Sequence, residues 1–151
     1  MSEEKRPDAS TERRSSFNPP FHRALCVKMR MGANREGIAY IDIDPEIHYG
    51  NRWAHGGMAG VLADISSGIA IALQLEEDGR EAIDGTVEMK VNFLRKVYNG
   101  DMTATATVVH LGKRLAVTDV DVTNNGELCA KAIVTFMLSR SKTLTPPHIG
   151  E

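Results

Sequence analysis

The 151-residue chain lacks the features that mark several large classes of protein. Its 18 lysines and arginines stand against 20 acidic residues, so it has no excess of positive charge with which to bind nucleic acid. Its two cysteines, Cys26 and Cys129, lie in apolar runs about a hundred residues apart, which disfavours a disulfide framework or a thiolate metal site. We expect both to be core strand residues of a protein from a reducing compartment.

Signals for export, for metals and for two common kinds of active site are also missing. The first twenty residues mix both signs of charge without an apolar segment, so we expect no secretory signal, no organelle transit peptide and a cytoplasmic location. No serine stands in a G-x-S-x-G elbow, and no nucleotide-binding glycine loop precedes a helix. Four histidines show no ligand spacing and predict no metal: His22, His48, His110 and His148.

Composition divides the chain into one body and two tails. Residues 1–20 have almost no apolar side chain before Phe17, so we expect a disordered N-terminal tail. Residues 139–151 contain Pro146 and Pro147 and predict a flexible C-terminal tail. The body, residues 21–138, is long enough for one hydrophobic core and too short for two of normal size.

Alternation of apolar and polar residues dominates the body and predicts strands. The run 39–43 alternates, and in the run 87–93 every odd position is apolar and every even position polar. Residues 103–108, 115–122 and 129–138 predict three further strands, and residues 124–126 predict a tight turn that needs positive φ. We expect these late strands to form an antiparallel meander.

One stretch departs from this alternation. From Gly57 to Leu75 the only charged residue is Asp64, and apolar residues recur at helical spacing. Its length would allow a membrane span, but three glycines, two serines and the aspartate favour a helix nearly engulfed by a curved sheet. The chain is therefore predicted to be an α+β domain, with one or two strands, a long central helix and then four strands.

Asp64 is the first candidate functional residue. An isolated carboxylate on a buried helix is costly unless it is paired or used. Its helical neighbours are three glycines, so another backbone or a ligand can approach it closely. Asp64 could act as a general base on a water molecule or as a nucleophile toward an acyl carbon, or it could simply pair with a cation such as Lys90 or Arg95.

The start of the same helix is the second candidate. His55, Gly56 and Gly57 open it, and its first N–H groups have no acceptor within the helix. Glycine lets a substrate oxygen approach these donors, as an oxyanion site requires, although Gly-Gly also commonly shapes a turn. Gly57 and Asp64 lie about 10 Å apart along one helix. Both can act on one carbonyl only if two copies of the helix lie antiparallel, as in a C2 dimer with two equal sites.

These residues belong to a longer pattern that extends beyond the helix. Residues 55–70 read H-G-G-x-x-x-x-L-x-D-x-x-x-G-x-A. The pattern continues with Thr86-Val87-Glu88-Met89-Lys90-Val91-Asn92-Phe93-Leu94-Arg95, Asn99-Gly100-Asp101 and Gly112-Lys113-Arg114-Leu115-Ala116-Val117. In that order, over residues 35–138, the chain strongly resembles hotdog-fold acyl-CoA thioesterases of the phenylacetate-degradation (PaaI) type, within the 4-hydroxybenzoyl-CoA thioesterase superfamily.

The resemblance implies a hotdog fold, in which a curved antiparallel sheet wraps around the long helix. It implies a homodimer with sheets paired edge to edge, commonly doubled into a homotetramer. The Gly57 amide would polarise the thioester carbonyl, Asp64 of the other subunit would be base or nucleophile, and Thr86 would position water. His55 of the same motif completes the candidate catalytic set. No metal or cofactor is implied, since CoA enters as part of the substrate.

The resemblance also implies substrate-binding residues. CoA contacts would fall near Arg95, Lys113 and Arg114, which could equally be plain solvated charges. Many relatives carry an asparagine six residues before the histidine, where this chain has Tyr49. Asn51 lies only four residues before His55 and is the candidate for this contact, together with Gly56. Trp53 either lines an acyl pocket or packs the entry of the helix.

The sequence thus predicts an enzyme that hydrolyses acyl-CoA thioesters, with no nucleic-acid or membrane partner. The alternative is a non-catalytic acyl-CoA-binding hotdog protein that serves as a sensor or a subunit. The presence of Asp64 favours the enzyme, because a pure binder gains nothing from a buried acid on a glycine-lined face. A hydratase on the same fold would need an Asp/His pair that is not evident here.

Overall fold

The computed structural model describes residues 18–77 and 83–139 of the chain. Most of both predicted tails, residues 1–17 and 140–151, lies outside the described residues. In chain order the elements are α2 (Pro20–Ala24), β1 (Lys28–Met31), β2 (Gly37–Asp42), α3 (Pro45–His48), α4 (Gly57–Glu77), β3 (Ile83–Phe93), β4 (Asp101–Leu111), β5 (Leu115–Asn124) and β6 (Glu127–Leu138).

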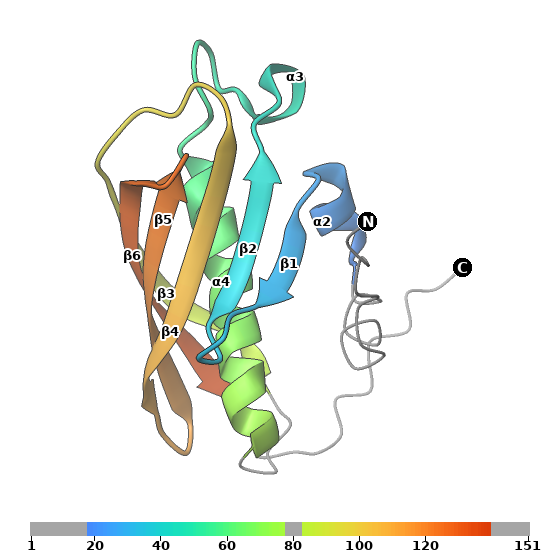
Figure 1. Cartoon of the computed structure of the whole chain (residues 1–151). Helices are drawn as coiled ribbons and strands as arrows, with labels where there is room; N and C mark the ends of the chain where they lie inside the picture. Colours follow the sequence, from blue (N-terminus) through green and yellow to red (C-terminus); the bar gives the residue numbers. More distant parts are fainter. Residues whose placement is uncertain (1–17, 78–82, 140–151) are drawn as a thin grey trace, which may run out of the picture.

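The strands form one antiparallel sheet in the order β1-β2-β4-β5-β6-β3. The sheet curves around α4, which lies against its inner face (Figure 1). This arrangement confirms the predicted α+β fold with one long central helix. β4, β5 and β6 form the predicted meander, closed by a turn with positive φ at Asn125 and Gly126. β3 instead joins the far side of β6 and becomes an edge strand.

Small residues let α4 lie close to the sheet. Ser66 and Ser67 are fully buried, and the Thr118 hydroxyl of β5 donates a hydrogen bond to the Ser67 hydroxyl at 2.7 Å. Gly37 of β2 faces the same turn of the helix, and a Cβ there would lie 1.9 Å from the Ser66 carbonyl oxygen. The segment Gly57–Glu76 is long and apolar enough to cross a membrane, but 61% of its most apolar window is buried inside the fold, as in a core helix.

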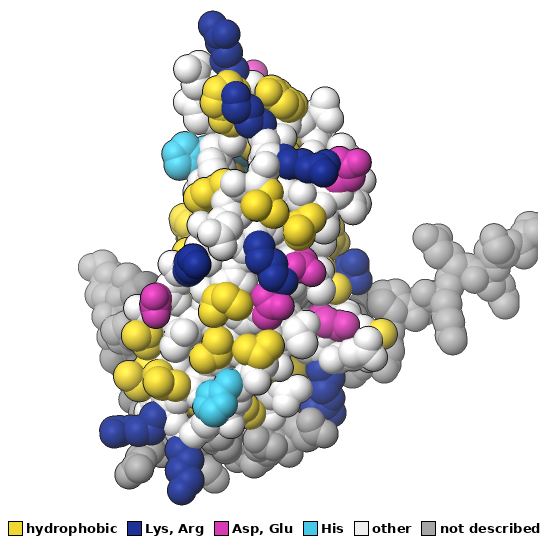
Figure 2. All heavy atoms as spheres, turned by 90° about the vertical axis from the view of Figure 1, so that its left-hand side faces the viewer, with side chains coloured by type: hydrophobic (Ala, Val, Ile, Leu, Met, Phe, Trp, Pro, Cys, Tyr) yellow, Lys and Arg dark blue, Asp and Glu magenta, His cyan; other side chains and the backbone are white. Residues whose placement is uncertain are grey.

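The two faces of the central strands differ in character. The buried even-numbered residues of β4, β5 and β6 face α4, and most of them are alanine or valine. On the outer face, the Lys131 ammonium forms ion pairs with Asp119 at 2.9 Å and Asp121 at 2.6 Å. Figure 2 shows hydrophobic side chains lying among charged ones on this side of the molecule. The exposed outer apolar patch consists of Leu115, Ile133 and Met137.

β3 keeps the predicted alternation, but a single chain does not cover its apolar side chains. Met89 and Phe93 pair with Val134 and Ala130 of β6 and therefore lie on the helix side of the sheet. They are nevertheless 41% and 61% exposed, because β3 lies at the edge beyond β6. Val87, at a register shift between Thr86 and Glu88, is also exposed.

Local patterns did not predict the two short helices or the place of Cys26. α2 and α3 are five and four residues long, too short to show a helical period. Cys129 is buried in β6 as predicted. The prediction that Cys26 is a core strand residue is wrong, because the chain turns there with φ 56° and leaves the thiol exposed. Both cysteines are free.

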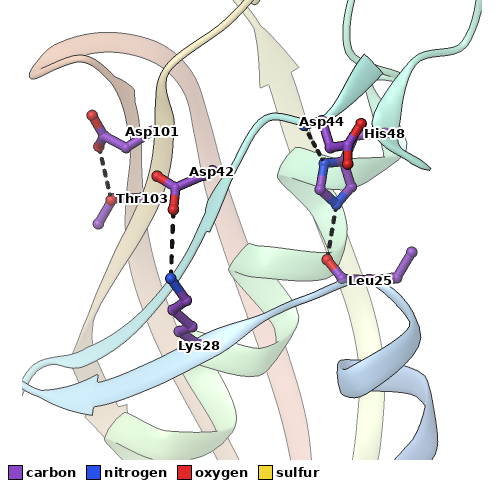
Figure 3. A network of polar contacts seen from close by, with 7 residues as sticks. All are labelled: Leu25, Lys28, Asp42, Asp44, His48, Asp101 and Thr103. Carbon is purple, nitrogen blue, oxygen red and sulfur yellow. Dashed lines mark hydrogen bonds and ion pairs between the residues drawn. The ribbon is translucent and has the colours of Figure 1, made fainter. Parts of the chain in front are cut away.

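A buried histidine ties the N-terminal segment to the loop that leads into α4 (Figure 3). His48 Nδ1 accepts a hydrogen bond from the Asp44 backbone N–H at 2.8 Å, and Nε2 contacts the Leu25 carbonyl oxygen at 2.8 Å. Because the Leu25 oxygen can only accept, these contacts select the neutral tautomer protonated on Nε2. His48 therefore has a structural role here.

Candidate active site

Asp64 projects from α4 toward the edge strand β3, where it meets Thr86. The Thr86 hydroxyl donates a hydrogen bond to Asp64 Oδ1 at 2.5 Å. A hydrogen bond to a carboxylate is stronger than one between neutral groups, so this contact fixes the orientation of the acid. Asp64 therefore has a hydroxyl partner on β3, and not the cation Lys90 or Arg95 that a purely structural role suggested. The sequence predicted both residues as site residues but not their contact.

His22 of α2 is a neighbour of Asp64 that sequence reasoning missed. Burial lowers the pKa of His22 from its ordinary value of 6.5, and the negative charge of Asp64 opposes that shift. No local pattern could have found this relation, since 42 residues of sequence separate the two side chains and only the tertiary fold brings them into one electrostatic environment. α2 thus forms part of the surroundings of the acid.

In this chain the side chain of His55 caps the start of α4. The Gly57 backbone N–H donates a hydrogen bond to His55 Nδ1 at 2.9 Å. The side chain of His55 therefore caps the helix, in the manner that oxygen-bearing side chains more often provide. The Gly57 N–H, predicted as an oxyanion donor, thus already has an acceptor, and a substrate oxygen would have to replace the His55 ring.

The glycines on the face of α4 near Asp64 differ in how closely other side chains approach them. A Cβ at Gly60 would lie 3.3 Å from the Met89 methyl group of β3, whereas a Cβ at Gly68 would meet no atom within 4 Å. At the helix start, a Cβ on Gly56 would lie 3.3 Å from the Phe93 ring. β3 therefore crosses this face, with Thr86 beside Asp64 and Phe93 beside Gly56.

A cavity of about 340 Å³ lies next to the helix start. Its walls come from the loop before α4, the first turn of α4, the end of β3 with the loop that follows, and the nearby ends of β4 and β6. The lining residues are Trp53, Ala54, His55, Gly56, Ala59, Phe93, Leu94, Arg95, Lys96, Val97, Met102, Cys129 and Ala130. The cavity volume is within the range of small-molecule sites.

Trp53 lines this cavity, and its ring contacts come from the segment that follows β3. The Lys96 ammonium lies 4.0 Å from the centre of the Trp53 ring, in a cation–π contact. Tyr98 meets Trp53 edge-on with ring centres 6.5 Å apart. These contacts hold the indole in place at the wall of the cavity.

Two of the predicted substrate-binding residues, Gly56 and Arg95, line the cavity, and the other three lie elsewhere in the single chain. Arg95 lines the cavity and forms an ion pair with Glu127. Lys113 and Arg114 lie in the turn between β4 and β5, at the opposite end of the sheet. Asn51 lies exposed in the turn that the Gly50 N–H closes on the Trp53 carbonyl, and it is not among the residues lining the cavity.

Among residues 18–77 and 83–139, no group of three or more histidine, cysteine or acidic side chains is arranged to hold a metal ion. The arrangement that is present can supply a carboxylate with a fixed orientation, a backbone N–H donor at a helix start and an adjoining cavity. These are the elements of acyl transfer by general base or nucleophilic catalysis.

The long helix, the curved antiparallel sheet and the acid on the helix face crossed by the edge strand define a hotdog-fold protein. The family model described as Thioesterase superfamily matches residues 53–131, more than half of the chain. The chain therefore belongs to the thioesterase superfamily, which confirms the family resemblance seen in the sequence.

Individual relatives agree with this assignment. The SSO1253 protein of Saccharolobus solfataricus is 35% identical over 57% of this chain, and the match spans only 55% of that relative's length. The 1,4-dihydroxy-2-naphthoyl-CoA hydrolase of Listeria monocytogenes is 29% identical over 61% of this chain and 72% of its own length. The medium/long-chain acyl-CoA thioesterase YigI of Salmonella typhimurium is 25% identical over 81% and 87%. The last two are named as enzymes acting on CoA thioesters, in agreement with the predicted enzyme class.

Solved structures show the same fold. Thioesterase HI1161 of Haemophilus influenzae has a TM-score of 0.77 and 21% identity, over 94% of this chain and 96% of its own. The E. coli PaaI protein from the phenylacetic acid degradation operon has a TM-score of 0.71 and 21% identity, over 86% and 91%. At these identities the structures establish the hotdog architecture alone.

Proposed function

We propose that the protein hydrolyses acyl-CoA thioesters to the free acid and CoA, with Asp64 as base or nucleophile. The observation that carries this proposal is the contact between Asp64 and Thr86, a carboxylate on the core helix oriented by a strand hydroxyl in a chain of the thioesterase superfamily. The names of the Listeria hydrolase and the Salmonella thioesterase support acyl-CoA as the substrate class.

The proposed site forms across a homodimer joined through β3. β3 is an 11-residue edge strand whose apolar side chains at Val87, Met89 and Phe93 are exposed, and such an edge favours pairing with another strand. In each chain β3 meets Asp64 near its start and Gly56 at its end. Two antiparallel copies of β3 would therefore bring the acid of each subunit to the helix start of the other.

In this arrangement the Gly57 N–H of one subunit polarises the thioester carbonyl, after its oxygen replaces the His55 ring. If Asp64 is the base, it takes a proton from a water held by Thr86, the water oxygen attacks the carbonyl carbon, and the proton passes to the departing CoA sulfur. If Asp64 is the nucleophile, its oxygen attacks the carbon, the CoA thiolate leaves, and water hydrolyses the resulting anhydride.

Antiparallel pairing would also bring cations from opposite ends of the sheet to the same end of the dimer. Arg95 lies at one end of the sheet and Lys113 with Arg114 at the other. Across a two-fold axis at β3, Arg95 of one subunit and the β4–β5 turn of its partner would lie at the same end. Cations there suit the phosphate groups of CoA, which remain outside the acyl site.

We also propose an oligomeric state and a cellular location for the enzyme. A second interface between dimers would cover the outer apolar patch of Leu115, Ile133 and Met137 and produce a homotetramer (Figure 2). We propose a cytoplasmic enzyme that needs no cofactor besides the CoA portion of its substrate, with neither nucleic acid nor membrane as a partner.

One observation favours the alternative, an acyl-CoA-binding protein without catalysis. The Gly57 N–H, the proposed oxyanion donor, already has an acceptor in His55 Nδ1. If that contact persists when a CoA ester binds, the carbonyl is not polarised, and the protein would bind its ligand without turning it over.

The test is release of the CoA thiol from a panel of acyl-CoAs, with wild-type protein compared with Asp64→Asn. The amide keeps the size of the side chain and removes its charge, so we expect kcat to fall by about 100-fold or more. Asp42→Asn, the same change at an exposed acid of β2, distant from β3 in the sheet, is the control and should retain activity. Binding of CoA esters without thiol release by the wild type would favour the binding protein, and an active Asp64→Asn would contradict the proposed role of the acid.

A further inference from the structure

The cavity at the start of α4 has a buried floor and an exposed mouth. Its floor includes Ala59, Met102, Cys129 and Ala130, each no more than 4% exposed, and its mouth includes the exposed residues His55, Gly56, Phe93, Leu94, Arg95 and Lys96. The floor carries no charged side chain. Burial also raises the pKa of the Cys129 thiol, so this side chain stays neutral.

We infer that this cavity is the acyl subsite of the enzyme and that it takes an apolar acyl group of about eight to ten carbons. The inference rests on the proposed function and adds the substrate class to it. The cavity is lined by Gly56 and Ala59, which flank Gly57 and Met58 in the first turn of α4. A thioester whose oxygen reaches the Gly57 amide therefore has its acyl chain at the mouth of this cavity.

The distribution of charge sets which end of the substrate enters. Arg95 and Lys96 stay at the exposed mouth, where Arg95 pairs with Glu127 and Lys96 stacks on Trp53. These cations suit the CoA side of the substrate, whereas the apolar floor suits a hydrocarbon chain. An acyl group with a carboxylate at its far end would place that charge on an apolar floor, which is unfavourable without a partner.

The volume sets the length of the acyl group. A group the size of a water molecule or a methylene occupies about 30 Å³, so about 340 Å³ holds roughly eleven such groups. Octanoyl, decanoyl and phenylacetyl groups fit within this limit. A palmitoyl chain exceeds it, and an acetyl group leaves most of the apolar floor without contacts.

The experiment is kcat/KM for acetyl-, butyryl-, octanoyl-, decanoyl-, phenylacetyl- and palmitoyl-CoA with the wild-type protein. Each methylene that enters an apolar site adds up to about fourfold in kcat/KM, so values should rise steeply from butyryl to octanoyl and fall again for palmitoyl. A higher value for phenylacetyl than for octanoyl would assign the subsite to aryl groups, and the reverse to straight chains. Both results support the inferred size.

Two variants test whether this cavity sets the preference. Met102→Ala enlarges the floor and should move the optimum to longer chains, while Ala130→Val fills it and should move the optimum to shorter ones. Ala132→Val is the matched control, on the same face of β6 and outside the cavity, and should keep the wild-type preference. Circular dichroism confirms folding, and the preference is read as a ratio of two substrates, so lower overall activity does not obscure it.

The results that would overturn the acyl subsite differ from those that would overturn the proposed function. Hydrolysis with equal kcat/KM for octanoyl and palmitoyl groups, or with acetyl as the best substrate, would overturn the acyl subsite and leave the proposed function intact. The acyl subsite is also overturned if Met102→Ala and Ala130→Val keep the wild-type optimum. If no acyl-CoA is hydrolysed, the proposed function is overturned, and the acyl subsite with it.

Discussion

At the scale of single residues, the site depends on one hydrogen bond that the sequence alone could not show. The Thr86 hydroxyl lies 2.5 Å from Asp64 Oδ1 and holds the carboxylate in one orientation. An acid that acts on a bound thioester must keep its position relative to the reacting carbon to within a fraction of an ångström. In the proposed reaction, Thr86 would therefore position Asp64 as well as contact the water.

Thr86→Val removes this hydrogen bond while keeping the shape of the side chain. A hydrogen bond to a charged group contributes about 1.5–3 kcal/mol, so we expect kcat to fall by about 10- to 100-fold with little change in KM. Thr86→Ser keeps a hydroxyl and should retain most of the turnover. Steady-state kinetics with one acyl-CoA checks both variants, and full activity of Thr86→Val would show that the hydroxyl has no part in the reaction.

His22 makes stability depend on pH in a defined direction. Its pKa in the folded protein is lowered from 6.5 by burial, so below about pH 6.5 the unfolded chain binds a proton more readily than the folded one. Stability should therefore decrease as the pH falls from 7 to 5. In His22→Gln this decrease should be smaller, as measured by urea unfolding at both pH values.

The exposed His110 provides the control for this measurement. His110→Gln should lose stability between pH 7 and 5 as the wild type does, because its side chain lies on the outside of β4. An identical loss in His22→Gln and the wild type would mean that His22 is not the group responsible.

At the scale of elements, α4 and the sheet fit together because small residues occupy their contact. A Cβ at Gly37 would lie 1.9 Å from the Ser66 carbonyl oxygen and 2.6 Å from the Ala70 nitrogen, both in the backbone of the helix. Neither atom can move without displacing α4. The close approach of helix and sheet thus depends on Gly37 of β2 as much as on the small residues of α4.

Gly37→Ala should therefore destabilise the fold. Overpacking of this kind costs about 1–3 kcal/mol, and a Tm lower by about 2–4 °C for each kcal/mol is expected for a domain of this size. Gly85→Ala is the matched control, since a Cβ there meets no atom within 4 Å. A thermal scan in which both variants melt at the same temperature would contradict the close packing.

The elements were largely predictable, and their neighbours in space were not. Alternation located β3 because its apolar positions recur every second residue, and helical spacing with Asp64 as its one charge located α4. Nothing local indicates that β3 pairs with β6 and not with β4, since strand order depends on how the chain crosses the sheet. Cys26 was misplaced for a related reason: an apolar run also fits a turn when its backbone adopts positive φ.

The candidate site was predictable to a similar extent. The motif around His55 and Asp64 identified the helix that carries the site, because glycines beside an isolated acid are unusual on a buried helix. The cavity could not be predicted, since residues from four separate stretches of the chain line it. The Gly57–His55 contact was also missed, because it depends on the orientation of one ring.

At the scale of the whole molecule, the proposed reaction requires a second copy of the chain. Gly57 and Asp64 lie about 10 Å apart along one helix, too far to act together on one carbonyl. The exposed apolar side chains of the edge strand β3 lie on the side where a second copy would bring the missing half. We therefore propose that each active site takes its amide from one subunit and its acid from the other.

Complementation between two inactive variants tests this sharing of residues between subunits. Gly57→Pro removes the amide donor at the first position of α4, where proline is tolerated, and Asp64→Asn removes the acid. Each variant alone should be inactive. When the two are unfolded and refolded together in equal amounts, half of the dimers should be mixed, each with one intact site, so about a quarter of wild-type activity should return. A mixture no more active than its two components would contradict a site shared between subunits.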